Sequence, residues 1–200
     1  MSSPLHRDHG GAKLGMWLFL FTELILFGGL FLLYAAYLAR YPQEFSAGGR
    51  ELNVLFGAAN TVVLLTSSLL AATAVTAMQR GRQSVSIMLL GGTFGCALLF
   101  LGIKSLEWGV KISHNIYPGS PKLMAGPPGE SVFFSLYYLT TGLHGLHVLI
   151  GATLLTFVAR RVVQDKVNAD NSSWLENSAL YWHLVDLVWI FIFPLYYLIL

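Results

Sequence analysis

The sequence predicts an all-α, polytopic membrane protein built as a single bundle of five transmembrane helices. Two observations carry this prediction. Only 11% of the 200 residues are charged whereas 55% are hydrophobic, and a soluble domain averages about 25% charged residues. The apolar residues also gather in five stretches, each longer than the roughly 20 residues that span a bilayer as a helix. We therefore treat residues 1–200 as one membrane domain.

The first three helices are predicted over residues 14–39, 52–78 and 84–110. The first is closed by Arg40, Tyr41 and Pro42, because proline does not continue a helix. The second is rich in Leu, Val, Ala, Ser and Thr, and a short basic link joins it to the third. These features indicate a tight helical hairpin.

The last two helices are predicted over residues 132–158 and 174–200. The long connection before them, residues 111–131, contains Pro118, Pro121, Pro127 and Pro128, and this composition favours an ordered surface loop over a helix. The fifth helix begins at a Ser173-x-x-Glu176 pattern that is typical of a capping box.

Five spans place the two termini on opposite sides of the membrane. With the N-terminus inside, seven Lys and Arg residues lie on the inner side and five on the outer side, so the positive-inside rule favours N-in and C-out. Aromatic residues toward the helix ends suggest an interfacial belt. These are Trp17, Tyr34, Tyr37, Trp108, Trp174 and Tyr196.

Several classes of protein are disfavoured by composition. The net charge of +2 and the lack of a Lys/Arg run give no sign of nucleic-acid binding. Cys96 is the only cysteine, so the chain has no disulfide framework and no CxxC motif. The polar N-terminus lacks the features of a cleaved signal peptide, and we expect the first helix to act as the insertion signal.

The stretch Tyr138–Gly151 is the first candidate for a functional site. His144 and His147 stand three residues apart and share one face of the fourth helix, while Gly142, Gly145 and Gly151 allow another backbone to approach. One hypothesis makes these histidines structural residues that tie helices together. Another makes the chain a bis-His haem b electron carrier, with haem between one of them and His183. No HExxH motif, carboxylate or thiolate completes a metal site beside them.

Glu23 is a second candidate because it lies roughly 14 Å into the first helix, near the bilayer midplane. An unpaired carboxylate is costly there, so Glu23 is expected to be protonated, hydrogen-bonded to a neighbouring helix, or both. The functional interpretation is a proton-handling acid, and the structural one is a neutral hydrogen bond between helices.

Two further pairs repeat the three-residue spacing. His183 and Asp186 can pair on one face of the fifth helix, and Lys104 can pair with Glu107 near the end of the third as an interfacial ion pair. We predict that the His183–Asp186 pair locks helices together. No nucleophilic Ser or Cys motif stands beside His183 and Asp186, so no catalytic residue is predicted.

Four motifs in chain order resemble subunit III of the haem–copper terminal oxidases, the family that includes cytochrome c oxidase subunit 3. They are Gly15-Met16-Trp17-Leu18-Phe19 followed by Glu23, Leu106-Glu107-Trp108, Thr141–Val148, and Tyr181–Trp189. The chain looks like the last five helices of the seven-helix mitochondrial form, as in shorter bacterial relatives that include quinol oxidase subunits.

The resemblance implies a function that the residues alone do not give. Members of this family hold no haem or copper, dock on catalytic subunit I beside subunit II, support proton uptake and bind structural phospholipid. The chain would then be an accessory subunit in a bacterial inner membrane, with haem and copper in its partners. Glu23 matches the family's buried, carbodiimide-reactive glutamate. Glu107, His144, His147, His183 and Asp186 match positions that hold the helices together.

The resemblance leaves three features of the complex undetermined. The complex could be a cytochrome c oxidase, a quinol oxidase or a related nitric oxide reductase. Ser172 stands where the mitochondrial form has a histidine that contacts a lipid headgroup, so specific lipid contacts are not carried over. The two N-terminal helices of the mitochondrial form have no counterpart here, so another chain would have to build the cleft that they form.

Overall fold

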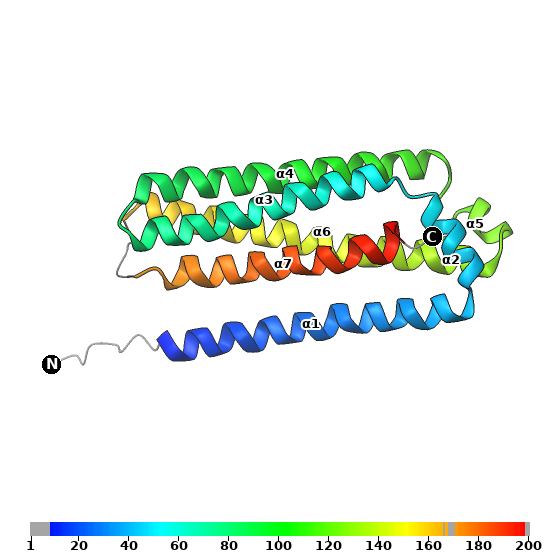
Figure 1. Ribbon diagram of the computed structural model, residues 1–200, viewed down its shortest axis with the longest axis horizontal. Coiled ribbons are helices and arrows are strands. Elements are labelled where there is room, and N and C mark those ends of the chain that lie inside the picture. The colour runs from blue at the N-terminus through cyan, green and yellow to red at the C-terminus, as the bar shows by residue number, and fades with distance from the viewer. Residues whose placement is uncertain (1–8, 166, 168–170, 199–200) are drawn as a thin grey trace.

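The computed structural model describes residues 9–165, 167 and 171–198. Seven helices account for most of this part of the chain, and five of them are long and apolar enough to cross a membrane. The long helices are α1 (His9–Arg40), α3 (Val54–Gln79), α4 (Gln83–Ser113), α6 (Pro128–Val163) and α7 (Ser173–Tyr197). They run side by side, and α1 lies along one flank of the other four (Figure 1). The predicted bundle of five transmembrane helices is thus confirmed.

Two short helices, α2 (Pro42–Arg50) and α5 (Pro121–Ala125), lie together at one end of the bundle (Figure 1). The sequence-based reading did not identify α2. The expectation of a loop over residues 111–131 was wrong in part, because α5 lies within it and α6 already begins at Pro128. Each of these helices has a proline in its first turn, where the missing N–H is unpaired in any case.

The predicted hairpin is formed by α3 and α4. Gly81 turns the chain between them with a φ of 71°, a conformation that glycine adopts without steric cost. At the level of the next turn, the Ser86 hydroxyl donates to the Ala74 carbonyl oxygen at 2.9 Å. This buried bond fixes the register of the two helices close to their connection.

The start of α7 differs from the expected capping box. The N-cap residue is Ser172 rather than Ser173, and its hydroxyl donates to Glu176 Oε1 at 2.7 Å. Gln79 at the end of α3 donates to the same carboxylate oxygen at 3.1 Å. The first turn of α7 is therefore tied to α3. Residues 199 and 200, at the end of the predicted fifth helix, lie outside the described residues.

The two ends of the bundle are distinct. The start of α1 and the end of α7 lie at opposite ends, as an odd number of spans requires (Figure 1). The side chains of Trp17 and Trp174 are 60% and 51% exposed, which suits an interfacial belt. Tyr34 and Tyr196, predicted to belong to that belt, are instead fully buried.

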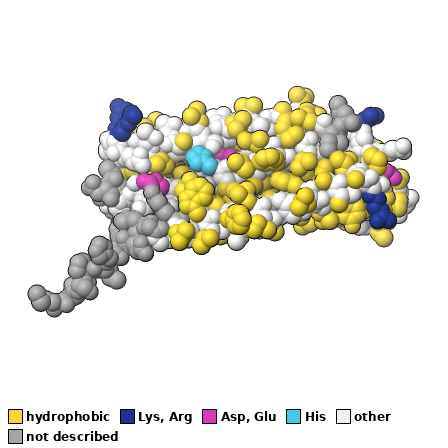
Figure 2. All heavy atoms as spheres, turned by 60° about the horizontal axis from the view of Figure 1, so that its bottom comes forward, with side chains coloured by type: hydrophobic (Ala, Val, Ile, Leu, Met, Phe, Trp, Pro, Cys, Tyr) yellow, Lys and Arg dark blue, Asp and Glu magenta, His cyan; other side chains and the backbone are white. Residues whose placement is uncertain are grey.

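The outer surface of the bundle is apolar over its length. Figure 2 shows hydrophobic side chains across the face that carries α1, with Lys and Arg gathered at the two ends. Large apolar side chains such as Leu18, Phe21 and Leu32 are more than half exposed. Such a surface matches the hydrocarbon layer of a bilayer.

Gly151 of α6 admits a large side chain from α7 rather than the neighbouring backbone that was expected. A Cβ at this position would lie 2.8 Å from Cε3 of Trp182, a fully buried residue. Gly151→Ala is therefore expected to destabilise the chain by about 1–3 kcal/mol through overpacking. Gly145→Ala in the same helix is the matched control, because its Cβ would meet nothing closer than 4.0 Å.

The two substitutions should change the free energy of unfolding in opposite directions as well as by different amounts. An alanine that fits without strain stabilises a helix by up to about 1 kcal/mol over glycine. Denaturant titration of the full chain in mixed micelles measures both changes. Equal stability of the two variants would show that Trp182 moves aside without cost.

Candidate functional site

Glu23 and His147 form a buried pair between α1 and α6. Glu23 Oε2 lies 2.9 Å from His147 Nε2, and the two side chains are only 14% and 10% exposed. The expectation that Glu23 bonds to a neighbouring helix is thereby confirmed. The ring of Phe27 packs edge-on against His147 at 5.3 Å between centroids and screens the pair.

The second ring nitrogen of His147 limits what this pair can do. Nδ1 lies 2.7 Å from the Leu143 carbonyl oxygen, which can only accept, so Nδ1 carries a proton. One further proton is then shared between Nε2 and the Glu23 carboxyl group. The pair has no net charge whichever atom holds that proton, which lowers the cost of burying it.

α1 has a second anchor nearer its end. The Tyr34 hydroxyl donates to the Leu195 carbonyl oxygen at 2.5 Å, one of the last carbonyls of α7. Its ring packs edge-on against Tyr196 and Phe45, with centroids 4.7 and 5.2 Å away. α1 is thus held by one polar contact at mid-depth and one near its end.

His144 occupies a different position from His147, although both lie on one helix. Its ring is fully buried between Phe100 of α4 and Trp189 of α7, at centroid distances of 5.4 and 5.2 Å. Neither ring nitrogen has a hydrogen-bond partner within the described residues. His144 therefore joins α4, α6 and α7 through ring packing.

His183 and Asp186 do not pair with each other, contrary to expectation. His183 Nδ1 lies 2.7 Å from the Ser68 hydroxyl of α3. Asp186 is 3% exposed, and neither carboxyl oxygen has a hydrogen-bond partner among the described residues. The geometric reason is that His183 turns toward α3, where a hydroxyl is available.

Two tryptophans extend this contact between α3 and α7. Trp182 Nε1 donates to Ser67 Oγ and Trp189 Nε1 donates to Thr61 Oγ1, each at 3.0 Å. Together with the Ser68–His183 bond they form polar contacts at two levels of the bundle, because Trp182 and His183 are adjacent and Trp189 lies about two turns further along α7. Hydroxyl side chains of α3 thus serve as hydrogen-bond partners between the two helices.

Lys104 and Glu107 form the most highly connected polar cluster. Lys104 Nζ lies 3.1 Å from Glu107 Oε2, and also donates to the hydroxyls of Tyr137 at 2.9 Å and Tyr197 at 2.6 Å. Both tyrosine hydroxyls donate to Glu107 at 2.8 Å. The pairing of Lys104 with Glu107 was correctly predicted, but its interfacial position was not. Lys104 and Glu107 are 5% and 2% exposed, so neither side chain extends to an interface.

The tyrosines of this cluster were missed because each stands among other aromatic residues near a helix end. Lys111, one turn beyond, was also unexpected inside the fold, where it donates to the Glu51 carbonyl oxygen at 3.0 Å. The spacing of residues within one helix does not indicate contacts between residues this distant in sequence. Glu107 and Tyr197, for example, are 90 positions apart.

The histidines are not arranged as a ligand set. Within the described residues, no group of three or more His, Cys, Asp or Glu side chains could hold a metal ion. His147 uses both ring nitrogens, and Nδ1 of His183 is taken by Ser68. The haem-carrier hypothesis therefore gains no support from this geometry.

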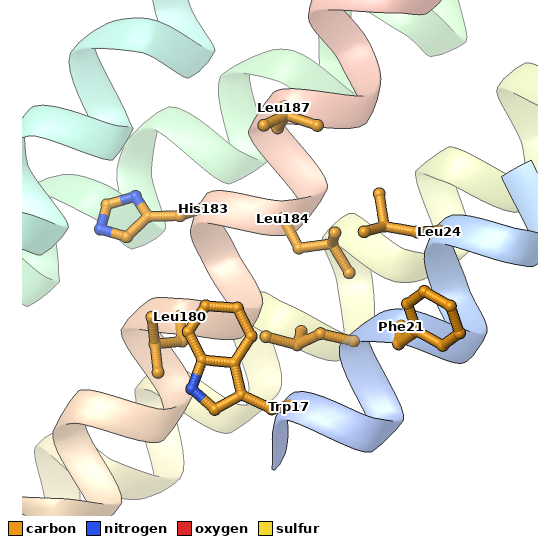
Figure 3. Close-up of a pocket in the computed structure, with 8 residues that line it drawn as sticks. Trp17, Phe21, Leu24, Leu180, His183, Leu184 and Leu187 are labelled. Carbon is orange, nitrogen blue, oxygen red and sulfur yellow. The ribbon is translucent and has the colours of Figure 1, made fainter. Parts of the chain in front are cut away.

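A pocket of about 340 Å³ lies between α1 and α7. Figure 3 shows Trp17, Phe21 and Leu24 on one side, and Leu180, Leu184 and Leu187 on the other. His183 lies at its margin and points from α7 away from α1 (Figure 3). A second pocket adjoins it and reaches Gln79 and Glu176 at the end of the bundle. We call these two adjoining pockets the α1–α7 groove.

Comparison with known proteins gives a consistent result. The family model described as Cytochrome c oxidase subunit III matches residues 6–199. The cytochrome bo(3) ubiquinol oxidase subunit 3 of Pseudomonas aeruginosa is 28% identical over 96% of this chain and 87% of its own length. The cytochrome c oxidase subunit 3 of Synechocystis sp. is 31% identical over 97% of this chain and 79% of its own.

A third relative has a different organisation. The heme-copper oxidase subunit I+III of Aeropyrum pernix is 28% identical over 98% of this chain, but the match covers only 23% of that longer protein. Because the family model spans nearly the whole chain, the chain belongs to the cytochrome c oxidase subunit III family.

Proposed function

We propose that this subunit III is a non-catalytic accessory subunit of a haem–copper oxygen reductase in the bacterial inner membrane. Its partners are the catalytic subunit I and subunit II, which supply haem and copper for the reduction of dioxygen. The family match over residues 6–199 is the observation that carries this proposal. The Aeropyrum relative supports contact with subunit I, since its name joins subunits I and III in one protein.

The chain's own role in this proposal is to stabilise subunit I and to support proton uptake. Glu23 and His147 do not conduct protons alone, because His147 Nδ1 is committed to the Leu143 carbonyl. The proton they share can move between Nε2 and Oε2, while the proton on Nδ1 stays bonded to a backbone carbonyl oxygen. A closed pair of this kind fits a residue that positions helices α1 and α6 for docking.

The docking surface is proposed to lie on the helices that bear this pair. α1 packs against α2, α6 and α7 but does not reach α3 or α4 within the described residues, so most of its circumference stays uncovered. Trp17, Leu18 and Ile25 are each about 60% exposed on it. Leu146 and Leu149 continue an exposed apolar surface on α6.

The α1–α7 groove is proposed to hold an acyl chain of a structural phospholipid. The part of the groove between Leu24 of α1 and Leu180 of α7 has an apolar lining, as a hydrocarbon chain requires. Its polar residues Gln79 and Glu176 lie at the helix ends, at the level of lipid headgroups. Because Ser172 is bonded to Glu176, the headgroup would meet a surface rich in hydrogen-bond acceptors.

The proposal is tested by tagging the chain, extracting it in mild detergent and identifying its partners by mass spectrometry. Recovery of subunit I with a copper-binding subunit II would establish a cytochrome c oxidase. A subunit II without the copper motif would establish a quinol oxidase. Recovery without any haem–copper subunit, or with a nitric oxide reductase, would contradict the proposal.

Glu23→Gln is the sharper test of the supporting role. The glutamine amide can donate to His147 Nε2, so we expect the assembled oxidase to keep its initial turnover while its lifetime during turnover changes. Glu23→Ala removes the bond and should weaken the attachment of α1 by about 1–3 kcal/mol. Glu51→Gln, at an exposed side chain, is the matched control. Complete loss of turnover in Glu23→Gln would contradict a supporting role.

A further inference from the structure

Asp186 is the buried acid that the fold and the proposed function leave unexplained. It lies in the middle of α7 and is 3% exposed, and both carboxyl oxygens lack a hydrogen-bond partner among the described residues. Glu23 and Glu107, by contrast, have partners. An ionised carboxylate with no partner is very costly in an apolar interior, so burial favours the neutral acid.

The groups around Asp186 are few and differ from helix to helix. From α3, the Ser68 hydroxyl lies beside the carboxyl group, although not in hydrogen-bonding geometry. From α4, the Cys96 thiol is close enough to interact with it electrostatically. From α6, no charged side chain in the described part of the chain pairs with it. None of these groups supplies a positive charge that would hold Asp186 ionised.

Ser68 connects Asp186 to the outside of the core. Its hydroxyl lies 2.7 Å from His183 Nδ1. His183 in turn lines both pockets of the α1–α7 groove, including the one that reaches Gln79 and Glu176 at the end of the bundle. A buried acid, a hydroxyl and an imidazole thus lie in sequence from the core to a groove.

We propose that Asp186 is a proton-binding site, neutral at rest, that exchanges its proton with the α1–α7 groove through Ser68 and His183. A rotation of the Asp186 side chain brings its hydroxyl to Ser68 Oγ. Ser68 then donates to His183 Nδ1, and the histidine carries its own proton on Nε2. This orientation gives the Asp186 and Ser68 hydroxyls one acceptor each.

Release of the proton is balanced at each atom. The Asp186 O–H bond breaks as a new bond forms at Ser68 Oγ, and the original Ser68 proton moves to His183 Nδ1. The imidazolium then loses the Nε2 proton to water at the end of the groove that carries Gln79 and Glu176. Asp186 is left ionised, Ser68 is unchanged, and His183 is neutral with its proton on Nδ1. Uptake is the reverse of these steps.

Infrared spectroscopy of the full chain in lipid bilayers tests the first half of the proposal. Among the described residues, Asp186 is the aspartate that lies in a membrane helix, whereas Asp165 follows the end of α6. Asp8 and Asp170 stand in polar stretches of the sequence. An aspartic acid in water loses its proton at about pH 4. A chain labelled with ¹³C-aspartate should therefore show one shifted carbonyl band of a protonated acid. Absence of that band at neutral pH would overturn the proposal.

Exchange into D₂O tests the second half. The rate at which the labelled band shifts should fall on the order of 100-fold in Ser68→Ala and in His183→Phe, the lower range of what a positioned proton carrier contributes. Ser105→Ala and His114→Phe are matched controls at exposed positions and should exchange at the original rate. Unchanged exchange in both Ser68→Ala and His183→Phe would overturn the relay.

The test does not depend on the Asp186→Asn variant folding, since the isotope assigns the band in the original sequence. It is also independent of the proposed function. The oxidase partners could prove wrong while the labelled band and its exchange behave as expected, and the reverse combination is equally distinguishable.

Discussion

Glu107→Leu is expected to destabilise the chain by about 3–5 kcal/mol, one of the two largest effects that we predict for a single substitution. The change leaves the Lys104 ammonium buried without a carboxylate. It also removes the acceptor of both tyrosine hydroxyls, Tyr137 and Tyr197, which can then donate only to each other, across 3.3 Å. Denaturant titration in mixed micelles measures the loss. Glu51→Leu, at an exposed carboxylate, is the control.

The double variant Lys104→Met/Glu107→Leu distinguishes the effect of losing the whole ion pair from the effect of leaving one buried charge unpaired. Removing both charges leaves two apolar side chains of similar volume, and such replacements are often neutral or stabilising. We expect the double variant to recover to within about 1 kcal/mol of the original chain. A double variant as unstable as Glu107→Leu alone would show that the cluster contributes net stability, contrary to this argument.

The five spanning helices could be predicted because the requirement for an apolar span is local. An apolar run of this length has few alternatives once charged residues are absent, and the first of the five, predicted over 14–39, is found at His9–Arg40. α2 and α5 escaped prediction for the opposite reason. Both segments are short and begin with proline, and α2 also contains two glycines and several polar residues. α2 is held in place by contact with α6, such as Phe45 against Phe133 at 5.3 Å between ring centroids.

Candidate site residues could be found, but their partners could not. The cost of burying a polar group singled out Glu23, His147 and Glu107. Glu23 and His147 are 124 positions apart, and no spacing within either helix indicates that they meet. The same limit explains His183. Its neighbour three positions away was the obvious partner, whereas its actual partner, Ser68, lies on another helix.

Trp189→Ala is expected to cost about 3–5 kcal/mol, because removing a fully buried indole leaves a cavity that the surrounding helices fill only in part. The Trp189 ring lies against several groups that would lose their support. Its ring lies 4.9 Å from that of Phe100 and 5.2 Å from that of His144, between centroids, and Lys104 Nζ lies 5.4 Å from the ring centroid. The substitution also removes the Nε1–H group that donates to Thr61 Oγ1.

Trp189→Phe and Trp174→Ala separate the contributions of ring volume, hydrogen bonding and burial to this loss of stability. Phenylalanine keeps most of the ring volume but cannot donate to Thr61, so we expect an intermediate loss of stability. Trp174 is 51% exposed, and its removal is expected to cost about 1 kcal/mol or less. If Trp189→Ala were no worse than Trp174→Ala, the helices would close around the missing ring. The aromatic packing around His144 would then not be what holds α4, α6 and α7 together.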